Sequence, residues 1–209
     1  ATYNKEVVDA YKNMEAELAD LRKELEALKA EKEAVKSSTG DSSKEIDSIA
    51  EKKKHAVKKM LAIDSVKAAG IELKRGNAQT AIDRLNVVLD DDPNHATALV
   101  VRAYAHSRIG NQNKALSDIN RALELKPNAP KALLLKGSLL LRKGNPRSAV
   151  NTLSRAIAVD SSCGRCYLLQ GKALTQLHQY RKAYYSGKMA CKKGEPEGCQ
   201  KIRTLQKKR

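Results

Sequence analysis

One period of 34 residues runs through most of this chain and restricts its fold more than any other feature. The tripeptides "RGN", "IGN" and "KGN" occur at Arg75–Asn77, Ile109–Asn111 and Lys143–Asn145, each 34 residues after the last. Pro93 and Pro127 have the same spacing. A third series with this period consists of Ala81, Ala115, Ala149 and Ala183. Three independent markers with one period indicate a stack of repeats that bury their apolar faces against one another.

The composition predicts that these repeats are helical. The 209 residues include no Trp, no Phe, 7 Tyr and only 5 Pro, and they are rich in Ala, Leu, Lys and Glu. Such residues form helices well, whereas strands favour aromatic and β-branched side chains. We therefore expect an all-α protein with a core of Leu, Ile, Val and Ala. No apolar run is long enough for a bilayer-spanning helix, so no transmembrane segment is expected.

The repeated residues resemble the tetratricopeptide repeat, in units 62–95, 96–129, 130–163 and 164–197. In this register, small residues at the eighth position let the first helix of each unit approach the second: Ala69, Ala103, Gly137 and Gly171. Gly76, Gly110 and Gly144 are expected to end the first helices in the left-handed conformation that Gly tolerates best. The resemblance implies a right-handed α-solenoid of four helix–turn–helix repeats, preceded by a helix of coiled-coil type.

The fourth unit departs from the pattern of the others. His178 stands where Gly is expected, Ser161 precedes the unit where Pro is expected, and Gly187 replaces a large side chain. Terminal units of a solenoid are often atypical because they cap the stack. We therefore expect the fourth unit, with a capping helix and basic tail over 198–209, to close the solenoid.

A heptad pattern precedes the repeats in residues 1–36. Its a and d positions hold Val7, Tyr11, Met14, Leu18, Leu21, Leu25, Leu28 and Val35, with Lys32 out of pattern. A lone helix cannot bury so narrow an apolar stripe, so the pattern requires a partner helix. We favour coiled-coil self-association, which predicts a homo-oligomer, over docking on the chain's own repeats. The expected oligomerisation residues are Val7, Tyr11, Met14, Leu18, Leu21, Leu25 and Leu28.

Residues 37–43, with the sequence "SSTGDSS", interrupt this pattern and predict a flexible linker. A leading amphipathic helix is expected over 44–61, with a basic face that includes "KKKHAVKK". Such a face is typical of a membrane-surface or nucleic-acid patch, but more often it is the solvated side of a leading helix. We favour the solvated face.

The resemblance also implies where a partner would bind. In the family, defined positions of each first helix line a concave face that holds an extended or helical peptide. Carried over to this chain, the expected groove residues are Val66, Leu73, Lys74, Val100, Tyr104, Arg108, Lys131, Leu134, Leu141, Arg142, Arg165, Leu168 and Lys172. An apolar strip with basic margins suits an amphipathic segment that carries acidic residues. The alternative is that some of these apolar side chains belong to the core or are covered by residues 44–61.

Some members of the family bind chaperone tails through a carboxylate clamp. That clamp needs Lys and Asn where this chain has Val66, Gly70 and Val101. Binding to heat-shock chaperone tails is therefore not expected.

All four cysteines, Cys163, Cys166, Cys191 and Cys199, lie around the last repeat. In the repeat register, Cys191 is near the end of a second helix and Cys199 is near the start of the next helix, so a bridge between them is reasonable. The segment "CKKGEPEGC" also looks like the helix junctions of cysteine-rich relatives of these repeats, where disulfides tie helices together. Cys163 and Cys166 in "CGRC" could bridge each other. We rank two disulfides first, a four-thiolate zinc site second and free thiols third.

The formal net charge of +16 is unevenly distributed: residues 1–36 carry −2 and the remainder carries +18. A basic field of this size attracts acidic protein surfaces, nucleic acid or anionic lipid. The first hypothesis is a scaffold that oligomerises through its N-terminal helix and binds a protein segment in the groove. The alternatives are a nucleic-acid or anionic-surface binder and, third, a thiol-redox role.

We expect no enzyme and no cofactor, because the sequence contains no phosphate-binding Gly loop, no His-Glu-x-x-His helix and no acyl-transfer elbow. The architecture is similar to the exported bacterial partner of the Tol–Pal envelope machinery, which has a coiled-coil segment before its repeats. The cysteine pattern favours an exported, periplasmic location over a cytoplasmic one.

Overall fold

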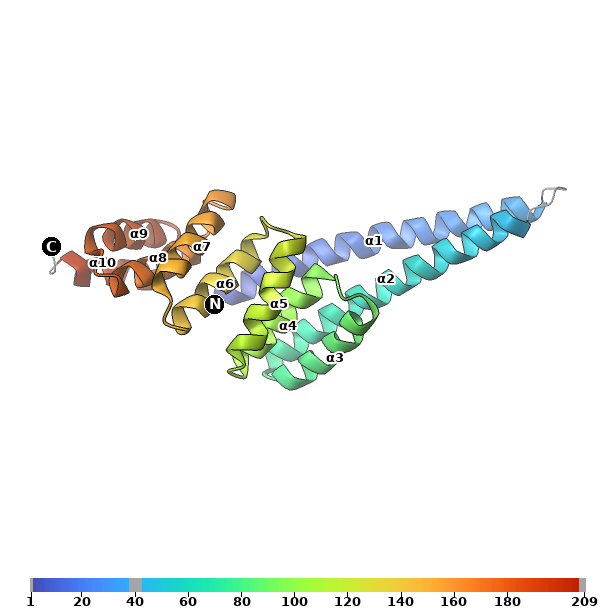
Figure 1. The fold of residues 1–209 in the computed structure, drawn as a ribbon. Helices are drawn as coiled ribbons and strands as arrows, with labels where there is room; N and C mark the ends of the chain where they lie inside the picture. Colours follow the sequence, from blue (N-terminus) through green and yellow to red (C-terminus); the bar gives the residue numbers. More distant parts are fainter. Residues whose placement is uncertain (1, 38–42, 207–209) are drawn as a thin grey trace. The chain divides into compact units, whose positions relative to one another are not determined.

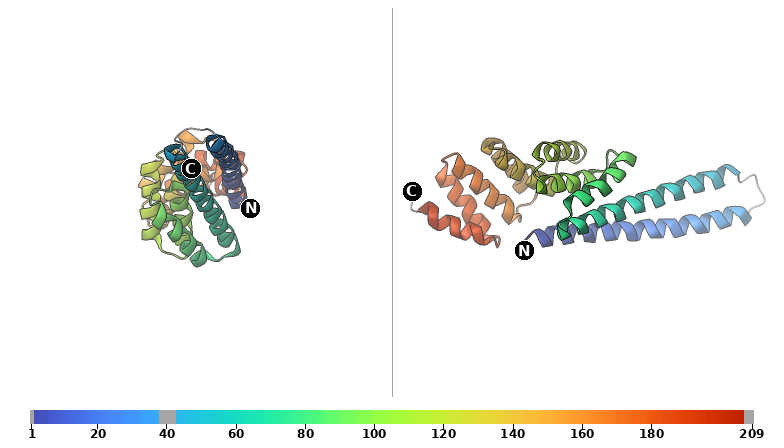
Figure 2. Two further views of the ribbon diagram at one scale, coloured as in Figure 1. Left: turned by 90° about the vertical axis from the view of Figure 1, so that its right-hand side faces the viewer. Right: turned by 90° about the horizontal axis from the view of Figure 1, so that it is seen from below.

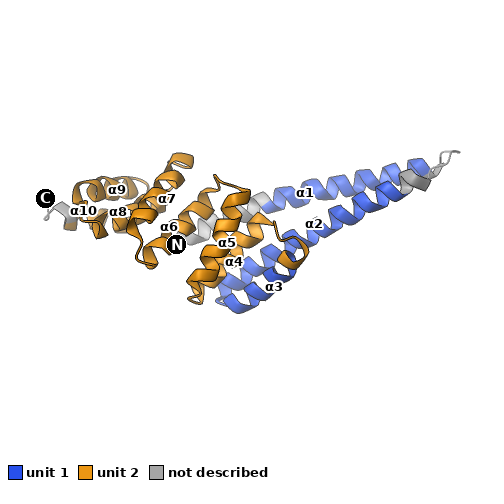
Figure 3. Ribbon diagram, viewed as in Figure 1, with its two compact units in different colours: residues 1–88 blue, residues 89–209 orange. Residues whose placement is uncertain are grey.

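The computed structural model describes the backbone of residues 2–37 and 43–206, and the side chains of residues 14–35 and 47–204. The described backbone forms ten α-helices and no strand, which confirms the all-α prediction. The chain divides into two compact units, residues 1–88 and 89–209 (Figure 3).

The first unit is built on an antiparallel helical hairpin of α1 (Thr2–Ser37) and α2 (Ser43–Arg75), which lie side by side along their lengths (Figures 1 and 2). Two ion pairs connect them: Glu17 Oε1 lies 3.2 Å from Lys59 Nζ, and Glu15 Oε1 lies 3.5 Å from Lys67 Nζ. The Glu17–Lys59 pair is exposed, and Glu15 is exposed next to a half-buried Lys67, so apolar burial contributes most of the stability of this hairpin.

The heptad stripe of α1 finds its partner within the chain. The buried side chains of the hairpin include Met14, Leu18, Leu21 and Leu28 on α1 and Ile49, Ala56 and Ile63 on α2. Leu25 is only half-buried, and Val7 and Tyr11 lie outside the described side chains. Self-association is therefore not needed to bury the three leucines and the methionine, because they are already buried within the hairpin. Oligomerisation remains a prediction.

Helix α2 continues without a break across the expected boundary between the leading helix 44–61 and the first repeat. No Gly or Pro occurs between Lys44 and Ala69, so nothing in the sequence ends the helix there. The linker expected over 37–43 lies, apart from its end residues, outside the described part of the chain.

Helix α3 (Ala78–Asp91) follows a tight turn and folds back beside the C-terminal part of α2 (Figure 1). The turn is closed by the Asn77 amide, which donates to the Glu72 carbonyl at 2.9 Å. Ala69, Ala81 and Leu85 are fully buried. This helix pair has the register expected for the first repeat.

The second unit contains three further helix pairs. They are α4 (Ala96–Arg108) with α5 (Gln112–Leu125), α6 (Pro130–Arg142) with α7 (Pro146–Val159), and α8 (Gly164–Gln176) with α9 (Tyr180–Lys192). The first helices of successive pairs, α4, α6 and α8, contact one another, and each second helix contacts the first helix of the next pair. This is the packing of a solenoid, and the first helices of the three pairs begin at Ala96, Pro130 and Gly164.

Left-handed residues end the first helices, as the sequence predicts. The φ angles of Gly76, Gly110 and Gly144 are +94°, +84° and +79°. His178 occupies the same place in the fourth unit with φ of +57°, so the fourth unit keeps the turn without the glycine. Its imidazole Nδ1 lies 2.9 Å from the Tyr180 hydroxyl, which offsets part of the cost of this conformation.

Helix α10 (Pro196–Gln206) packs on α9 and caps the stack, beginning two residues before the expected 198. Glycines make the contact close. A Cβ atom on Gly198 would lie 2.7 Å from the Cys191 amide nitrogen and 2.9 Å from the Gly187 carbonyl oxygen. A Cβ atom on Gly187 would already lie 3.5 Å from Ile202 Cγ1, so the longer apolar side chain that other units have at this position would meet α10.

Candidate functional site

Ten of the expected groove residues belong to the first helices α4, α6 and α8 of the second unit: Val100, Tyr104, Arg108, Lys131, Leu134, Leu141, Arg142, Arg165, Leu168 and Lys172. We call these ten residues the first-helix face. The other three expected residues, Val66, Leu73 and Lys74, belong to α2 in the first unit.

The apolar strip expected along this face is largely core. Leu134 and Leu168 are 9% and 3% exposed, and Val66 and Leu73 on α2 are 1% and 2% exposed. These side chains cannot touch a ligand without rearrangement, which corrects the expectation that they line an open groove. The physical reason is that these positions also face neighbouring helices. The apolar side chains that remain partly accessible are Val100, Tyr104 and Leu141.

Arg142 and Lys172 bond to residues of other helices. Arg142 Nη1 donates to the Ser107 Oγ at 2.8 Å and to the Ser107 carbonyl at 3.2 Å, which links α6 to α4. Lys172 Nζ donates to Glu197 Oε2 and links α8 to α10. The Lys172 ammonium lowers the pKa of Glu197 below its ordinary value through this hydrogen bond and its charge. Arg142 and Lys172 therefore connect neighbouring helices of the second unit.

Arg108, Lys131 and Arg165 are exposed, one on each of the three first helices. Together with the half-buried Val100, Tyr104 and Leu141, they give this face a basic and partly apolar surface. Three guanidinium or ammonium groups next to apolar side chains can pair with carboxylates while an apolar segment packs between them.

A half-buried ion pair lies between α4 and α5, and the sequence reasoning missed it. Arg102 Nε and Nη2 donate to the two carboxylate oxygens of Asp118 at 2.9 and 2.8 Å. The hydrogen bond to Asp118 raises the pKa of Arg102 above its ordinary value. A charged pair on two helices of one repeat leaves no periodic signal, because the other units have different residues at these positions.

His106 lies one turn beyond Arg102 on α4 and is 7% exposed. Within the described residues its Nδ1 is buried and has no hydrogen-bond partner. Burial lowers the pKa of His106, while the nearby Asp118 carboxylate raises it and Arg102 and Lys114 lower it further. The imidazole is therefore held in its neutral form.

The acidic run Asp90–Asp92 ends one helix and leads into the next. Asp92 Oδ1 accepts from the Asn94 amide at 3.0 Å. The N-cap of α4 is His95, whose Nδ1 accepts from the Ala98 amide at 3.2 Å. These contacts explain the residues as helix caps.

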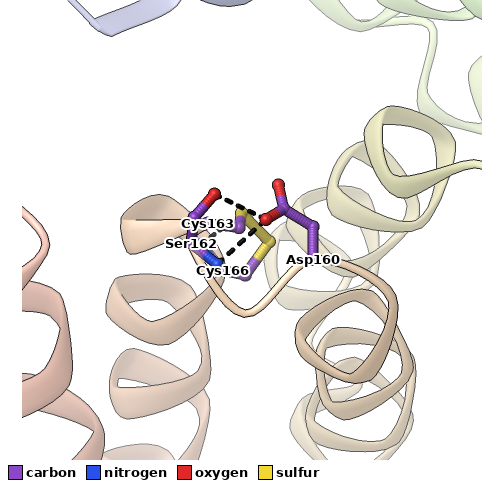
Figure 4. The surroundings of a disulfide bond; sticks show 4 residues. All are labelled: Asp160, Ser162, Cys163 and Cys166. Carbon is purple, nitrogen blue, oxygen red and sulfur yellow. Dashed lines mark hydrogen bonds between the residues drawn. A yellow bond between two sulfur atoms is a disulfide. The ribbon is translucent and has the colours of Figure 1, made fainter.

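The four cysteines form two disulfides. Cys191 and Cys199 join α9 to α10, with Cα atoms 4.8 Å apart. Cys163 and Cys166 join within the first turn of α8, with Cα atoms 5.3 Å apart (Figure 4). This is the arrangement ranked first from the sequence.

The described side chains contain no group of three His, Cys, Asp or Glu residues that could hold a metal ion. Among the described helices, none combines the length and the hydropathy that a membrane span requires.

Two family models match the sequence. A tetratricopeptide-repeat model matches residues 67–130, and the model described as subunit 3 of the anaphase-promoting complex (cyclosome) matches residues 108–186. A search of the curated proteins finds no match to the chain.

Solved structures of repeat proteins share the fold. The structure of MamA has a TM-score of 0.62 at 21% identity, over 69% of this chain and 80% of that chain. YrrB, described as a tetratricopeptide-repeat protein with an unusual peptide-binding site, has a TM-score of 0.60 at 15% identity, over 69% of this chain and 75% of that chain. The first tetratricopeptide-repeat domain of Spaghetti (RPAP3), bound to the HSP90 peptide SRMEEVD, has a TM-score of 0.52 at 17% identity, over 54% of this chain and 90% of that chain.

Proposed function

The chain belongs to the tetratricopeptide-repeat family, and on this premise we propose that it is a protein-interaction scaffold whose first-helix face binds a segment of a partner protein. The observation that carries the proposal is the presence of one exposed basic residue on each of α4, α6 and α8, together with half-buried apolar side chains on α4 and α6. Two proteins of the same fold, YrrB and the RPAP3 domain, are described as peptide-binding. This supports a peptide or helix as the ligand.

The ligand of the proposal has acidic character. Arg108, Lys131 and Arg165 place one positive charge on each first helix, and no acidic residue belongs to the first-helix face. Carboxylates paired with guanidinium groups form charge-assisted hydrogen bonds that are stronger than neutral ones. Apolar residues of the ligand would pack on Val100, Tyr104 and Leu141. An amphipathic segment with Asp or Glu on one side fits both requirements.

The experiment that tests this proposal selects peptides from a random display library on the full-length protein. We expect the selected peptides to be enriched in Asp, Glu and large apolar residues. Selection is repeated on the Arg108→Glu/Arg165→Glu variant, which reverses two exposed charges without touching the core. Arg147→Glu/Lys188→Glu is the matched control, because it reverses two exposed charges on the second helices α7 and α9.

Peptides that bind the charge-reversed variant and the control equally well would contradict the proposed face. Leu134 and Leu168 are unsuitable for this test, because a charge at a position that is 9% or 3% exposed would unfold the repeat.

Binding to nucleic acid through the basic surface remains the rival prediction. Neutralisation of phosphates predicts an affinity that falls steeply with salt concentration. A titration of the full chain with double-stranded DNA at several salt concentrations separates the two functions. Tight, sequence-independent binding at physiological salt would favour the rival.

The compartment is also a proposal. Disulfides persist in oxidising environments such as the periplasm and the extracellular space. Two disulfides in the last repeat and its cap therefore support an exported protein.

Oligomerisation through α1 is the remaining part of the scaffold proposal. Light scattering on residues 1–209 and 44–209 tests it. Equal numbers of subunits for the two proteins would contradict oligomerisation through α1.

A further inference from the structure

The two disulfides differ in what they connect. Cys191 and Cys199 tie the end of α9 to α10, so they hold the capping helix in place. Cys163 and Cys166 are only three residues apart and lie at the start of one helix (Figure 4). The stabilisation that a disulfide gives grows with the length of the loop that it closes. The Cys163–Cys166 bond closes a very short loop and crosses no helix junction, so fold stability alone gives little reason for it.

The position of Cys163 favours the thiolate that its reduction would produce. Cys163 is the N-cap of α8, and its Sγ accepts a hydrogen bond from the Cys166 amide at 3.2 Å. The free amides and the dipole at a helix N-terminus stabilise negative charge. Reactive cysteines occur in such settings, particularly in Cys-x-x-Cys segments with basic neighbours.

Charged groups from three elements surround this segment. Arg165 lies between the two cysteines and is exposed. Gly164 packs on the α9–α10 turn, where a Cβ atom would meet Lys193 Cβ and Glu195 Cγ, each at 3.0 Å. Asp160 lies before the segment, and its Oδ1 already accepts from the Ser162 amide and hydroxyl at 2.9 and 2.6 Å. The basic residues here are thus Arg165 and Lys193, and the acidic residues are Asp160 and Glu195. The Asp160 carboxylate is already hydrogen-bonded, and Glu195 is buried.

The two sulfur atoms also differ in access. Cys163 is partly exposed, whereas Cys166 is fully buried in the core cluster of the second unit. An incoming thiolate therefore reaches Cys163 and not Cys166. Access of this kind decides which sulfur is attacked in thiol–disulfide exchange. Cys166 would be the leaving group and would remain next to Cys163, ready to close the bond again.

We propose that the Cys163–Cys166 disulfide is a thiol–disulfide exchange site that oxidises dithiols, whereas Cys191–Cys199 is structural. A thiolate of the dithiol attacks Cys163 Sγ, the Cys163–Cys166 bond breaks, and Cys166 leaves as a thiolate. The second thiolate of the dithiol then attacks its own sulfur in the mixed disulfide, and Cys163 leaves as a thiolate. Two electrons pass from the dithiol to the cysteine pair, the dithiol becomes a disulfide, and its two protons go to the cysteines or to water.

The test uses the full-length oxidised protein and dithiothreitol as the dithiol. The protein is equilibrated at a series of reduced-to-oxidised dithiothreitol ratios, the free thiols are alkylated, and the two cysteine pairs are quantified separately by peptide mass spectrometry. We expect Cys163–Cys166 to be half-reduced at a ratio about tenfold lower than Cys191–Cys199. Reduction of both pairs at the same ratio, or of Cys191–Cys199 first, would overturn the proposal.

Two single variants test the order of attack. In Cys166→Ser, Cys163 should form a mixed disulfide with oxidised glutathione about tenfold faster than Cys166 does in Cys163→Ser. A synthetic peptide "SSCGRSY", which carries the same cysteine without the helix, is the control for the intrinsic reactivity. Equal rates for the two variants, or a rate for Cys163 no faster than that of the peptide, would also contradict the assignment. The titration of the unmodified protein remains decisive if either variant fails to fold.

Discussion

Gly137 and Gly171 occupy the same position in consecutive first helices, but their surroundings differ. A Cβ atom on Gly137 would lie 2.6 Å from Leu153 Cγ, and Leu153 is fully buried. A Cβ atom on Gly171 would meet its nearest neighbours, the Ala183 carbonyl oxygen and Ser186 Cβ, at 3.4 and 3.5 Å, which is ordinary contact. The small residue is thus required at one position and only tolerated at the other.

We predict opposite effects of the same substitution at these two sites. Gly137→Ala forces Leu153 to move in a filled core, which costs about 1–3 kcal/mol and exceeds the gain in helix propensity of about 0.5–1 kcal/mol. Gly171→Ala has the same gain in helix propensity without a steric clash, so its effect on stability should be neutral or stabilising. Urea unfolding of the full chain measures both. A Gly137→Ala variant as stable as Gly171→Ala would show that the α6–α7 contact is looser than described.

His106 gives the second unit a pH dependence. Because burial lowers the pKa of His106, the unfolded chain binds a proton at a pH where the folded chain does not. The free energy of unfolding should therefore fall as the pH drops below about 6.5, the ordinary imidazole value, until the folded pKa is passed.

His106→Leu should remove this part of the pH dependence, which urea unfolding at pH 7, 6 and 5 would measure. His55→Leu, a change at an exposed position of α2, is the control and should keep it. An unchanged slope in His106→Leu would mean that Asp118 compensates for burial.

Among the helices, the α1–α2 hairpin is stabilised by an apolar seam whose side chains are buried to different extents. Leu21 is 5% exposed, whereas Leu25 is only half-buried, although both occupy core positions of the heptad. The ion pairs beside the seam are exposed and contribute little.

Replacement of heptad leucines by Ala should therefore lower the stability of the hairpin by unequal amounts. Leu21→Ala should destabilise the hairpin by about 2–5 kcal/mol, and Leu25→Ala by about 1 kcal/mol. Hydrogen exchange of the α1 and α2 amides in the full chain measures the loss locally. Equal effects would indicate that Leu25 is covered as well, as expected if a second copy of the chain packs on it.

At the scale of the whole molecule, the sequence predicts the repeats well because their markers are local. Gly76, Gly110 and Gly144 specify turns through backbone conformation, and a fixed period places them in register. The same register favours the Cys191–Cys199 bridge but does not by itself pair Cys163 with Cys166. Solvent exposure is not local, so the burial of Leu134 and Leu168 could not be predicted from their positions alone.

The same limit applies to pairings between distant residues. The sequence shows that Arg142 and Lys172 are basic, but only the structure shows that they bond to Ser107 and Glu197. The heptad pattern of α1 shows that the helix needs a partner helix but does not identify that partner. Packing on α2 and packing on a second copy of the chain would both bury the apolar side chains of the pattern.

The most direct test of a peptide-binding site on the first-helix face uses one acidic amphipathic peptide from the display selection. Fluorescence anisotropy measures its Kd for the unmodified protein, for Arg108→Glu/Arg165→Glu and for Arg147→Glu/Lys188→Glu. We expect the reversal of the two charges on α4 and α8 to weaken binding by about tenfold or more. The control should bind with the same Kd as the unmodified protein. Equal affinities for all three proteins would contradict a binding site on the first-helix face.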